Sequence, residues 1–339
     1  MAGASLGEPK VELPASGAVA PVPDFVSSRP TPRLNARSIA SESPSIPFGS
    51  RIVLLALRLL ARLPLRWLHR IGGVGGRVVY RLSSAMRAHL RDNVRRAGIL
   101  GPVDDDVVER FALVNATELG KGALEVLPAW FGRPADVMKT VRLDSTWSQV
   151  EPLLASGRGV IFLTPHLGAF EVAAQFAASR MPVTIMHRPP RLKWLRPVLR
   201  HGRSQGCAQL TTADTQGVRA LLRALRRGEA IALLPDQVPA KHHGVVEADF
   251  FGHPVHTTTL IGRLQQATGA AIVFVRMQRL PDAQGFDLSF LPIAPLPTDE
   301  RAAALVLNKM QEDLIRSCPE QYLWSYNRFK APMTPPSDG

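Results

Sequence analysis

The chain has 339 residues, of which 45% are hydrophobic, and it carries a formal net charge of +13. This length is enough for one large domain or two modest ones, and the apolar content allows a sizeable core. Its two cysteines, Cys207 and Cys318, exclude a disulfide framework and fit a reducing cytosol, and the lack of clustered Cys and His motifs argues against a metal site.

The positive charge is concentrated in one segment. Residues 51–100 contain eleven arginines and a single acid, Asp92, which gives them a charge of +10. The formal charges of residues 1–50 sum to zero, and the rest of the chain carries a charge of +3. A segment of this kind is expected to bind phosphates, either of lipid head groups or of nucleic acid.

Residues 1–48 are rich in Pro, Ser, Ala and Gly and show no sustained periodicity, which predicts a disordered tail. The tail has no basic start, long apolar run or cleavage pattern, so it does not read as a signal peptide. At the other end, residues 331–339 are predicted to be a flexible C-terminus.

Residues 49–71 are predicted to form a basic amphipathic helix. Arginines recur at every fourth position from Arg58 to Arg70, and leucines with Trp67 cover an apolar side. The apolar run is too short for a bilayer span of about 20 residues, and Pro64 is expected to bend or interrupt the helix. We therefore expect it to lie in the membrane interface, with Trp67 at head-group level. A packed surface helix with a solvated basic face is the alternative.

Further along, the glycine-rich residues 72–76 are expected to form a loop, and residues 77–96 to resume a basic helix. The acidic residues 104–106 predict the start of a long helix that reaches about residue 130. From residue 159 onward, apolar strand patterns alternate with helical ones, which predicts βαβ units and a mostly parallel sheet flanked by helices. The expected strands are 160–163, 183–186, 231–234, 271–275 and 286–291, and the expected helices are 148–154, 192–199, 214–227, 257–268 and 298–317.

The stretch GVIFLTPHLGAFEVAAQ, residues 159–175, carries the first candidate site. A buried strand is expected to end at Thr164-Pro165, because proline cannot donate to a strand ladder, and a helix to begin after Gly168. His166 lies between them, and Glu171 follows it with the spacing H-x4-E. In this arrangement a neutral histidine can take a proton from a hydroxyl while a carboxylate holds its other N–H. The less specific reading is a satisfied polar histidine and an acidic helix-capping residue.

Two later strands also end in polar residues. His187 and Arg188 follow one, and Asp236 and Gln237 follow the other. The carboxyl ends of parallel strands lie at one edge of a sheet, so these groups are expected to converge near His166. Taken singly, each also has a simpler explanation, Arg188 as a surface charge and Asp236 as a turn former.

Two further motifs lie near the end of the chain. Phe250, Phe251 and Gly252 belong to a loop in which the phenylalanines either line an apolar slot for an acyl chain or pin the loop to the core. The aromatic and basic run PEQYLWSYNRFK follows at residues 319–330.

Together these motifs resemble those of the lipid A biosynthesis lauroyl/myristoyl acyltransferases, a branch of the lysophospholipid acyltransferase superfamily. The resemblance covers about residues 54–330 and implies a glycerol-3-phosphate acyltransferase-like α/β domain at 72–330. One departure is Pro190-Arg191 after the Arg188-Pro189 pair, where the family often has asparagine.

The resemblance implies transfer of a fatty acyl group from acyl carrier protein to a hydroxyl of a lipid A precursor at the cytoplasmic face of the inner membrane. It also implies that the reaction needs no metal, no cofactor and no covalent acyl-enzyme. The partners it implies for the protein are acyl carrier protein, anionic membrane lipids and the precursor. His166 is then the general base and Glu171 orients it.

In the same scheme Arg188 and Arg203 bind a phosphate or acidic sugar, and Asp236, Gln237, Phe251 and Gly252 shape the pocket. An acyltransferase of another glycolipid or aminolipid stays open, as does a non-catalytic membrane-binding relative. A nucleic-acid binder is disfavoured, because no nucleic-acid motif is present.

Overall fold

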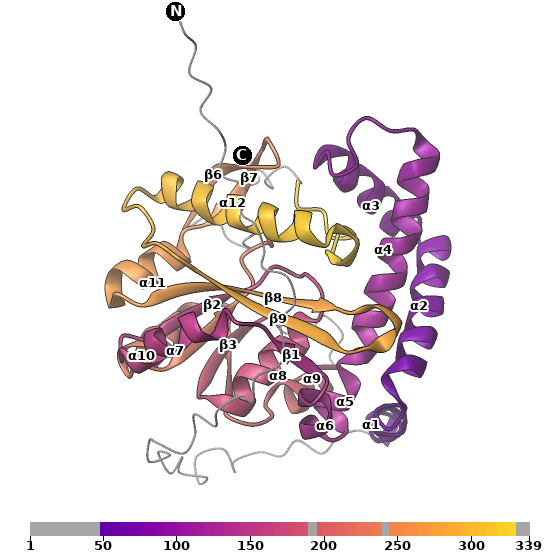
Figure 1. The fold of residues 1–339 in the computed structure, drawn as a ribbon, viewed down its shortest axis with the longest axis horizontal. Helices are drawn as coiled ribbons and strands as arrows, with labels where there is room; N and C mark the ends of the chain where they lie inside the picture. The colour runs from indigo at the N-terminus through magenta and orange to yellow at the C-terminus, as the bar shows by residue number, and fades with distance from the viewer. Residues whose placement is uncertain (1–47, 189–194, 239–243, 330–339) are drawn as a thin grey trace, which may run out of the picture.

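The computed structural model describes residues 48–188, 195–238 and 244–329 (Figure 1). The predicted N-terminal tail up to residue 47 and the predicted flexible C-terminus lie outside the described residues. So do Pro190 and Arg191, where the sequence departs from the family pattern.

The described part of the chain begins with a run of helices, and strands alternate with helices through much of the part that starts at residue 141. The helices are α1 (Phe48–Leu60), α2 (Leu65–Leu82), α3 (Ser84–Arg96), α4 (Asp105–Glu125), α5 (Leu127–Phe131), α6 (Pro134–Met138), α7 (Trp147–Ala155), α8 (Phe170–Arg180), α9 (Leu195–Arg203), α10 (Thr215–Arg226), α11 (Leu260–Thr268) and α12 (Glu300–Ser317). The strands are β1 (Val141–Leu143), β2 (Val160–Leu163), β3 (Val183–His187), β4 (Ala208–Thr212), β5 (Ala230–Leu233), β6 (Val245–Phe250), β7 (His253–Thr258), β8 (Ala271–Arg279) and β9 (Phe286–Ile293).

Seven of these strands form one sheet in the order β1-β9-β8-β2-β5-β3-β4. All neighbouring strands are parallel except β8 and β9, which are antiparallel. This confirms the predicted α/β class with a mostly parallel sheet. β2 and β5 lie side by side at its centre, with Leu163 opposite Leu233, so the loops that follow them leave the sheet together.

The sheet is buried on both faces, which explains the continuous apolar runs of its central strands. Alternate residues of each strand point to opposite faces. Ile161 and Leu163 pack in a core that includes residues of α10, α11 and α12, while Val160 and Phe162 pack in a second core with α7 and α8. In Figure 1, α12 lies over one face of the sheet and α8 under the other, with α2, α3 and α4 at one end.

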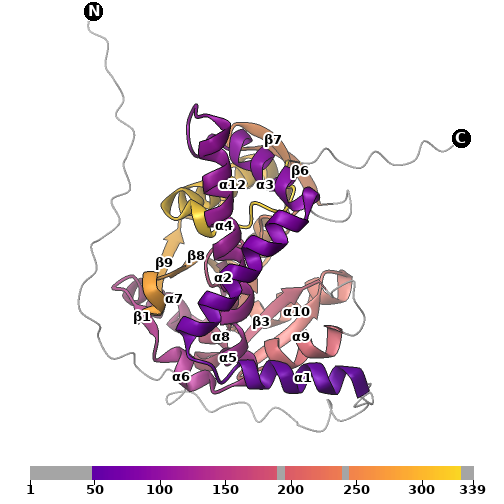
Figure 2. The same ribbon diagram turned by 90° about the vertical axis from the view of Figure 1, so that its right-hand side faces the viewer.

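The prediction of a loop at residues 72–76 is wrong, because these residues lie inside α2. This helix crosses α4 at close range (Figure 2). A Cβ added to Gly76 would lie 1.9 Å from the carbonyl oxygen of Ala116, and one added to Gly120 would lie 2.0 Å from that of Gly72. The glycines are therefore required by close contact between the two helices and not by a turn. The membrane-interface helix is expected to end at residue 71, but α2 continues past this residue.

Helices α1 and α2 are separated by a turn at residues 61–64, which confirms that Pro64 interrupts the predicted helix. Pro64 lies immediately before the first residue of α2. At the start of a helix, its fixed φ and missing N–H do no harm. Among the helices that the structure describes, none is long and apolar enough to cross a lipid bilayer.

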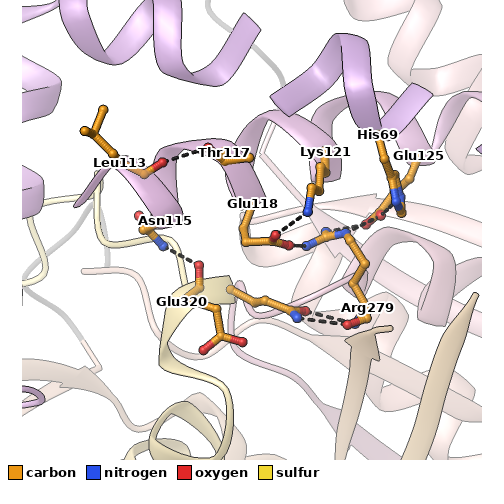
Figure 3. Close-up of polar contacts among 10 residues, drawn as sticks. His69, Leu113, Asn115, Thr117, Glu118, Lys121, Glu125, Arg279 and Glu320 are labelled. Atoms are coloured by element: carbon orange, nitrogen blue, oxygen red, sulfur yellow. Dashed lines mark hydrogen bonds and ion pairs between the residues drawn. The ribbon is translucent and has the colours of Figure 1, made fainter. Parts of the chain in front are cut away.

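A buried ion network joins the N-terminal helices to the sheet (Figure 3). Arg279 of β8 donates to both oxygens of Glu125 at 2.5 and 2.6 Å, and to Glu118 at 2.7 Å. His69 of α2 lies 3.0 Å from Glu125, and Lys121 donates to Glu118. Burial raises the pKa of Glu125, but the adjacent Arg279 and His69 outweigh this and lower it to about 2.

Two further expectations need correction. The helix predicted at 257–268 begins only at Leu260, because Thr257 and Thr258 end strand β7 of an antiparallel β6–β7 hairpin. The cap of α12 is the Asp299 side chain, which accepts from Ala302 N, and not Thr298. The cap predicted at Asp214 is confirmed, since its side chain accepts from Gly217 N at the start of α10.

Candidate active site

His166 lies in the short loop between β2 and α8, as the strand–turn–helix pattern predicts. Gly168, two residues later, has a φ of +59°, and a Cβ there would lie 2.1 Å from the carbonyl oxygen of Met277. Only glycine fits this turn, and the turn brings His166 to the carboxyl edge of the sheet. The imidazole is 17% exposed, and its ring packs edge-on against Phe170 at 5.0 Å.

Asp236 holds the histidine at two points. One carboxylate oxygen lies 2.7 Å from His166 Nδ1, and the other accepts from the His166 backbone N–H at 2.9 Å. The Asp236 side chain is 3% exposed. Burial alone would raise its pKa, but attraction to His166 and the hydrogen bonds from it outweigh this, so the pKa lies below the ordinary value. Asp236 is therefore a carboxylate at neutral pH.

The remaining ring nitrogen of His166 is the one available to a substrate. A carboxylate at Nδ1 fixes the proton on that atom, which leaves a lone pair on Nε2. Gln237 Nε2 lies 3.3 Å from His166 Nε2, where an amide N–H donates to that lone pair. The hydroxyl of a substrate can replace this amide donor.

Glu171 does not make the contact that the H-x4-E spacing predicts. It lies in the first turn of α8 and pairs with Arg203 of α9, whose Nε lies 3.1 and 3.2 Å from its two oxygens and whose Nη2 also donates to it. The carboxylate that orients His166 is thus Asp236, and Glu171 orients Arg203. The guanidinium of Arg203 also lies 5.7 Å from the centre of the Trp130 ring.

Phe251 and Gly252 lie away from this site. They form the turn of the β6–β7 hairpin, with φ of +50° and +73°. Phe251 is buried against Phe250 and Trp324, and its backbone N–H donates to Glu312 of α12 at 2.7 Å. Of the two readings of this motif, the structure supports the one in which it pins the hairpin to the core.

A cavity of about 1020 Å3 opens beside His166. Gln237, Arg188 and the paired Glu171 and Arg203 also line it, so five of the predicted site residues are brought together there, while Asp236 lies buried beneath His166. Arg188 is exposed. Within the described ranges, no group of three or more His, Cys, Asp or Glu side chains is placed to hold a metal ion.

The cavity reaches both faces of the sheet, since Ala232 and Leu233, consecutive in β5, both line it. We call the part between the sheet and α7–α8 the aromatic arm, which is lined by Trp147, Phe162, Phe176, Ile185, Leu288 and Phe290. The part beside α10 and α11 is the mixed arm, which is lined by Val218, Leu222, Leu260, Leu264, Asp214 and Arg263.

A second histidine, His187, lies at the end of β3 and lines the same cavity. Its Nδ1 donates to the carbonyl oxygen of Thr211 at 3.0 Å. Burial, together with the positive charges of Arg203 and Arg200, lowers the pKa of His187, although the bond to Thr211 opposes this. His187 is therefore neutral at pH 7 and offers the cavity an acceptor nitrogen.

The Asp236 contact has a signal in the sequence. His166 stands three residues after Leu163, and Asp236 stands three residues after Leu233, its partner across the β2–β5 ladder. Residues at equal distance from a paired position on adjacent parallel strands are expected to lie close together. The strand alignment could therefore identify this pair.

Comparisons with known proteins identify the family of this chain. A family model described as bacterial lipid A biosynthesis acyltransferase matches residues 39–331. The lipid A biosynthesis palmitoleoyltransferase of Escherichia coli (strain K12) is 30% identical over 229 residues, covering 66% of this chain and 72% of that protein. The lipid A biosynthesis lauroyltransferase of the same organism is 26% identical over 267 residues, covering 75% and 85%. The chain belongs to the bacterial lipid A biosynthesis acyltransferase family and is an acyltransferase.

Proposed function

We propose that this enzyme transfers a fatty acyl group from acyl-acyl carrier protein to a hydroxyl of a lipid A precursor, with His166 as the general base. The observation that carries the proposal is His166 itself, with Nδ1 fixed by a buried carboxylate and Nε2 beside a large apolar cavity. Family membership supports late acylation of lipid A. The donor and the base are our inference.

The proposed step balances without a cofactor. His166 Nε2 takes the proton of the acceptor hydroxyl as its oxygen attacks the thioester carbonyl, and the tetrahedral intermediate then loses the carrier thiolate. The imidazolium returns its proton to that sulfur. Asp236 stabilises the transient positive charge on the ring, and the products are an ester and the free carrier thiol.

The acceptor is expected to be anionic, because cations stand beside the base. Arg188 is exposed at the cavity, and Arg203 lines it with its guanidinium held by Glu171. Arginine binds phosphate and carboxylate through charge-assisted hydrogen bonds. We assign both residues to a phosphate or acidic sugar of the acceptor.

A transfer assay tests the reaction class. Purified wild-type enzyme would be given a lipid A precursor and acyl carrier proteins charged with medium to long chains, with mass spectrometry of the lipid product. The expected product gains the mass of one acyl group, and the preferred donor gives the chain length. Transfer only to a different glycolipid or an aminolipid would overturn the acceptor, and no transfer to any lipid would favour a non-catalytic relative.

The transferred chain is assigned to the aromatic arm. Its lining is apolar. Phe290 packs edge-on against Trp147 at 5.2 Å and at a tilt against Phe162 at 6.1 Å, which gives this arm a rigid wall. The mixed arm carries Asp214 and Arg263, charged groups that do not suit a saturated chain.

A ring placed inside the aromatic arm should therefore shorten the accepted chain. Ala173 of α8 lines this arm, and Ala173→Phe is expected to lower kcat/KM for the longest donor at least about 10-fold relative to a donor two carbons shorter, since each methylene is worth about 1–3 kcal/mol. Leu222→Phe in the mixed arm is the matched control and should leave the chain preference unchanged. An unchanged preference in Ala173→Phe would contradict the assignment.

We further propose that α1 and α2 attach the enzyme to the cytoplasmic face of the inner membrane. Exposed apolar side chains follow one another along α2 at helical spacing, and exposed arginines flank them. Leu82, the most exposed of them, is 81% exposed. The apolar residues are Leu55, Leu59, Trp67, Ile71, Val74, Val78 and Leu82, and the arginines are Arg58, Arg62, Arg66, Arg70, Arg77 and Arg81.

Reversing Arg58, Arg62 and Arg66 to Glu should release the enzyme from anionic vesicles. Each basic residue near an anionic surface contributes about 1 kcal/mol, so the loss of three weakens partitioning on the order of 100-fold. Cosedimentation with phosphatidylserine-containing vesicles measures this. The matched control reverses Arg301, Lys309 and Arg316 of α12, which should leave sedimentation unchanged. Equal binding of both triple variants would argue against a membrane role for α1 and α2.

A further inference from the structure

Residues 319–329, which we call the C-terminal strap, contain the PEQYLW and NRF motifs that the proposed function leaves unexplained. The strap leaves α12 at Cys318 and begins with a single 3-10 turn, Pro319–Gln321. It then passes beside both loops that carry the histidine and the carboxylate of the site.

The strap binds the backbone of the His166 loop on both sides of the histidine. Leu323 N–H donates to the carbonyl oxygen of His166 at 3.0 Å, and Gly168 N–H donates to that of Gln321 at 3.1 Å. Leu167 and Tyr322 form an isolated antiparallel bridge between these bonds. The position of His166 is therefore set by the strap as well as by β2.

The same strap binds the Asp236 loop. Tyr322 is buried beside the Asp236 carboxylate: burial, the charge of Asp236 and hydrogen bonding to it raise the pKa of the Tyr322 hydroxyl well above its ordinary value. Two residues further along that loop, Val238 N–H donates to the hydroxyl of Tyr326 at 3.0 Å. One segment thus connects the two loops that form the His166–Asp236 pair.

Arg328 adds a buried positive charge beside this pair. The residue is 2% exposed, and its guanidinium donates to the carbonyl oxygen of His256 at 2.8 Å and to Thr257 Oγ1 at 3.2 Å, both neutral atoms. Burial lowers the pKa of Arg328, while the charges of Tyr322, Asp236 and Tyr326 oppose this lowering. A buried charge needs a counter-ion, and the carboxylate among these groups is Asp236.

The strap is in turn anchored to the N-terminal helices and to β8. Asn115 of α4 donates to the carbonyl oxygen of Glu320 at 2.8 Å (Figure 3) and to that of Tyr322 at 2.7 Å. Asn93 of α3 donates to two further strap carbonyls at 2.7 Å each. The side chain of Gln321 bonds both the N–H and the C=O of Arg279. These buried side chains fix the strap, so the strap can fix the site.

We propose that Tyr322 and Arg328 are positioning residues of the acyl transfer reaction: they keep Asp236 ionised and aimed at His166 Nδ1, so that Nε2 stays free to accept the substrate proton. The proposal rests on the proposed role of His166 as base. Tyr322 acts by a hydrogen bond and Arg328 by charge.

Tyr322→Phe tests the first part, because it removes only the hydroxyl and keeps the ring that packs on Trp324 at 4.8 Å. We expect kcat to fall on the order of 10-fold to 100-fold, the range for a hydrogen bond to a charged group, with both KM values changed less than about twofold. Tyr80→Phe is the matched control, since the buried Tyr80 hydroxyl donates to Glu109 at 2.9 Å on α4, outside the cavity. It should leave kcat unchanged.

The pH profile of kcat/KM separates positioning from folding. The titratable and charged groups that act on Asp236 are His166, Tyr322 and Arg328. Tyr326 in turn acts on Tyr322 and Arg328. Removing the positive charge in Arg328→Met favours protonated His166, so the acid limb should move to higher pH, and Arg328→Lys should restore the wild-type limb. Should Arg328→Met not fold, Tyr322→Phe alone decides, and its acid limb should move in the same direction.

Wild-type kcat and an unmoved acid limb in Tyr322→Phe would overturn the inference. A parallel measurement of His166→Ala distinguishes this from failure of the proposed function. If His166→Ala is inactive while Tyr322→Phe is fully active, only the role of the strap is wrong. If His166→Ala is itself fully active, the proposed base is wrong.

Discussion

Replacing Asp236 by asparagine is expected to lower kcat by about 10²–10⁴-fold, the range of general base catalysis, with little change in the KM of either substrate. Asp236 is the group that accepts from Nδ1 of His166 at 2.7 Å. An asparagine amide can donate to this nitrogen, which favours the tautomer with its proton on Nε2, and that tautomer cannot accept a proton from the substrate. Steady-state kinetics with the preferred acyl donor measures the change.

Glu171→Gln is the matched comparison, since it removes a carboxylate of the same cavity that does not touch His166. Glu171 pairs with Arg203, so its loss should act mainly on the KM of the anionic acceptor. A kcat loss in Glu171→Gln as large as that in Asp236→Asn would restore the role that the H-x4-E spacing predicts for Glu171.

Arg279→Met is expected to lower the free energy of unfolding by about 3–5 kcal/mol, the usual effect of breaking a buried ion pair. Arg279 bridges Glu125 and Glu118, and its own side chain is 3% exposed. Without it, His69 is the one ion-pair partner that Glu125 keeps among the described residues. Urea unfolding followed by circular dichroism measures the change. Lys309→Met, which breaks the exposed Lys309–Asp313 pair, should change stability by less than about 1 kcal/mol.

The pH dependence of stability follows from the same network. The pKa of Glu125 is lowered to about 2, against about 4.3 in an unfolded chain, so the unfolded state binds its proton first as pH falls. The stabilisation is complete at neutral pH and is lost as pH falls from about 5 toward 2. Arg279→Met should reduce the steepness of this loss, and an unchanged slope would contradict the role given to Arg279.

The strands of the central sheet were predictable because their apolar runs are continuous and bounded by Gly, Pro or polar residues. The runs that became β2 and β5 are buried on both faces, which leaves a strong local signal. β6 and β7 were missed, because only alternate residues of this hairpin are buried and its strands therefore lack a continuous apolar run. Local patterns predict an element well only where burial dominates its composition.

The glycines of α2 show the limit of local reasoning about helices. Gly72 and Gly76 indicate a loop when read alone, because glycine disfavours helices. Their helical role depends on Gly120 and Ala116 in α4, which only the tertiary contact reveals. The sequence shows the glycines of α2, but it does not show that α4 is the helix that packs against them.

At the site, the residue types were predictable and one of their pairings was not. His166, Arg188, Asp236 and Gln237 gather at the sheet edge as predicted from the ends of their strands. Glu171 was assigned to His166 from spacing along the chain, whereas the rotation of the first turn of α8 carries it to Arg203. Side-chain direction in a helix, and not distance in sequence, decides this pairing.

The central claim is that His166 takes the proton of the acceptor hydroxyl, and acyl transfer by His166→Ala tests it most directly. The variant would be compared with wild type on the preferred acyl-acyl carrier protein and the lipid A precursor, with the acylated product quantified by mass spectrometry. We predict that transfer falls by about 10²–10⁴-fold while the variant stays folded and bound to anionic vesicles. Near-wild-type transfer by a folded, vesicle-bound His166→Ala would contradict the account.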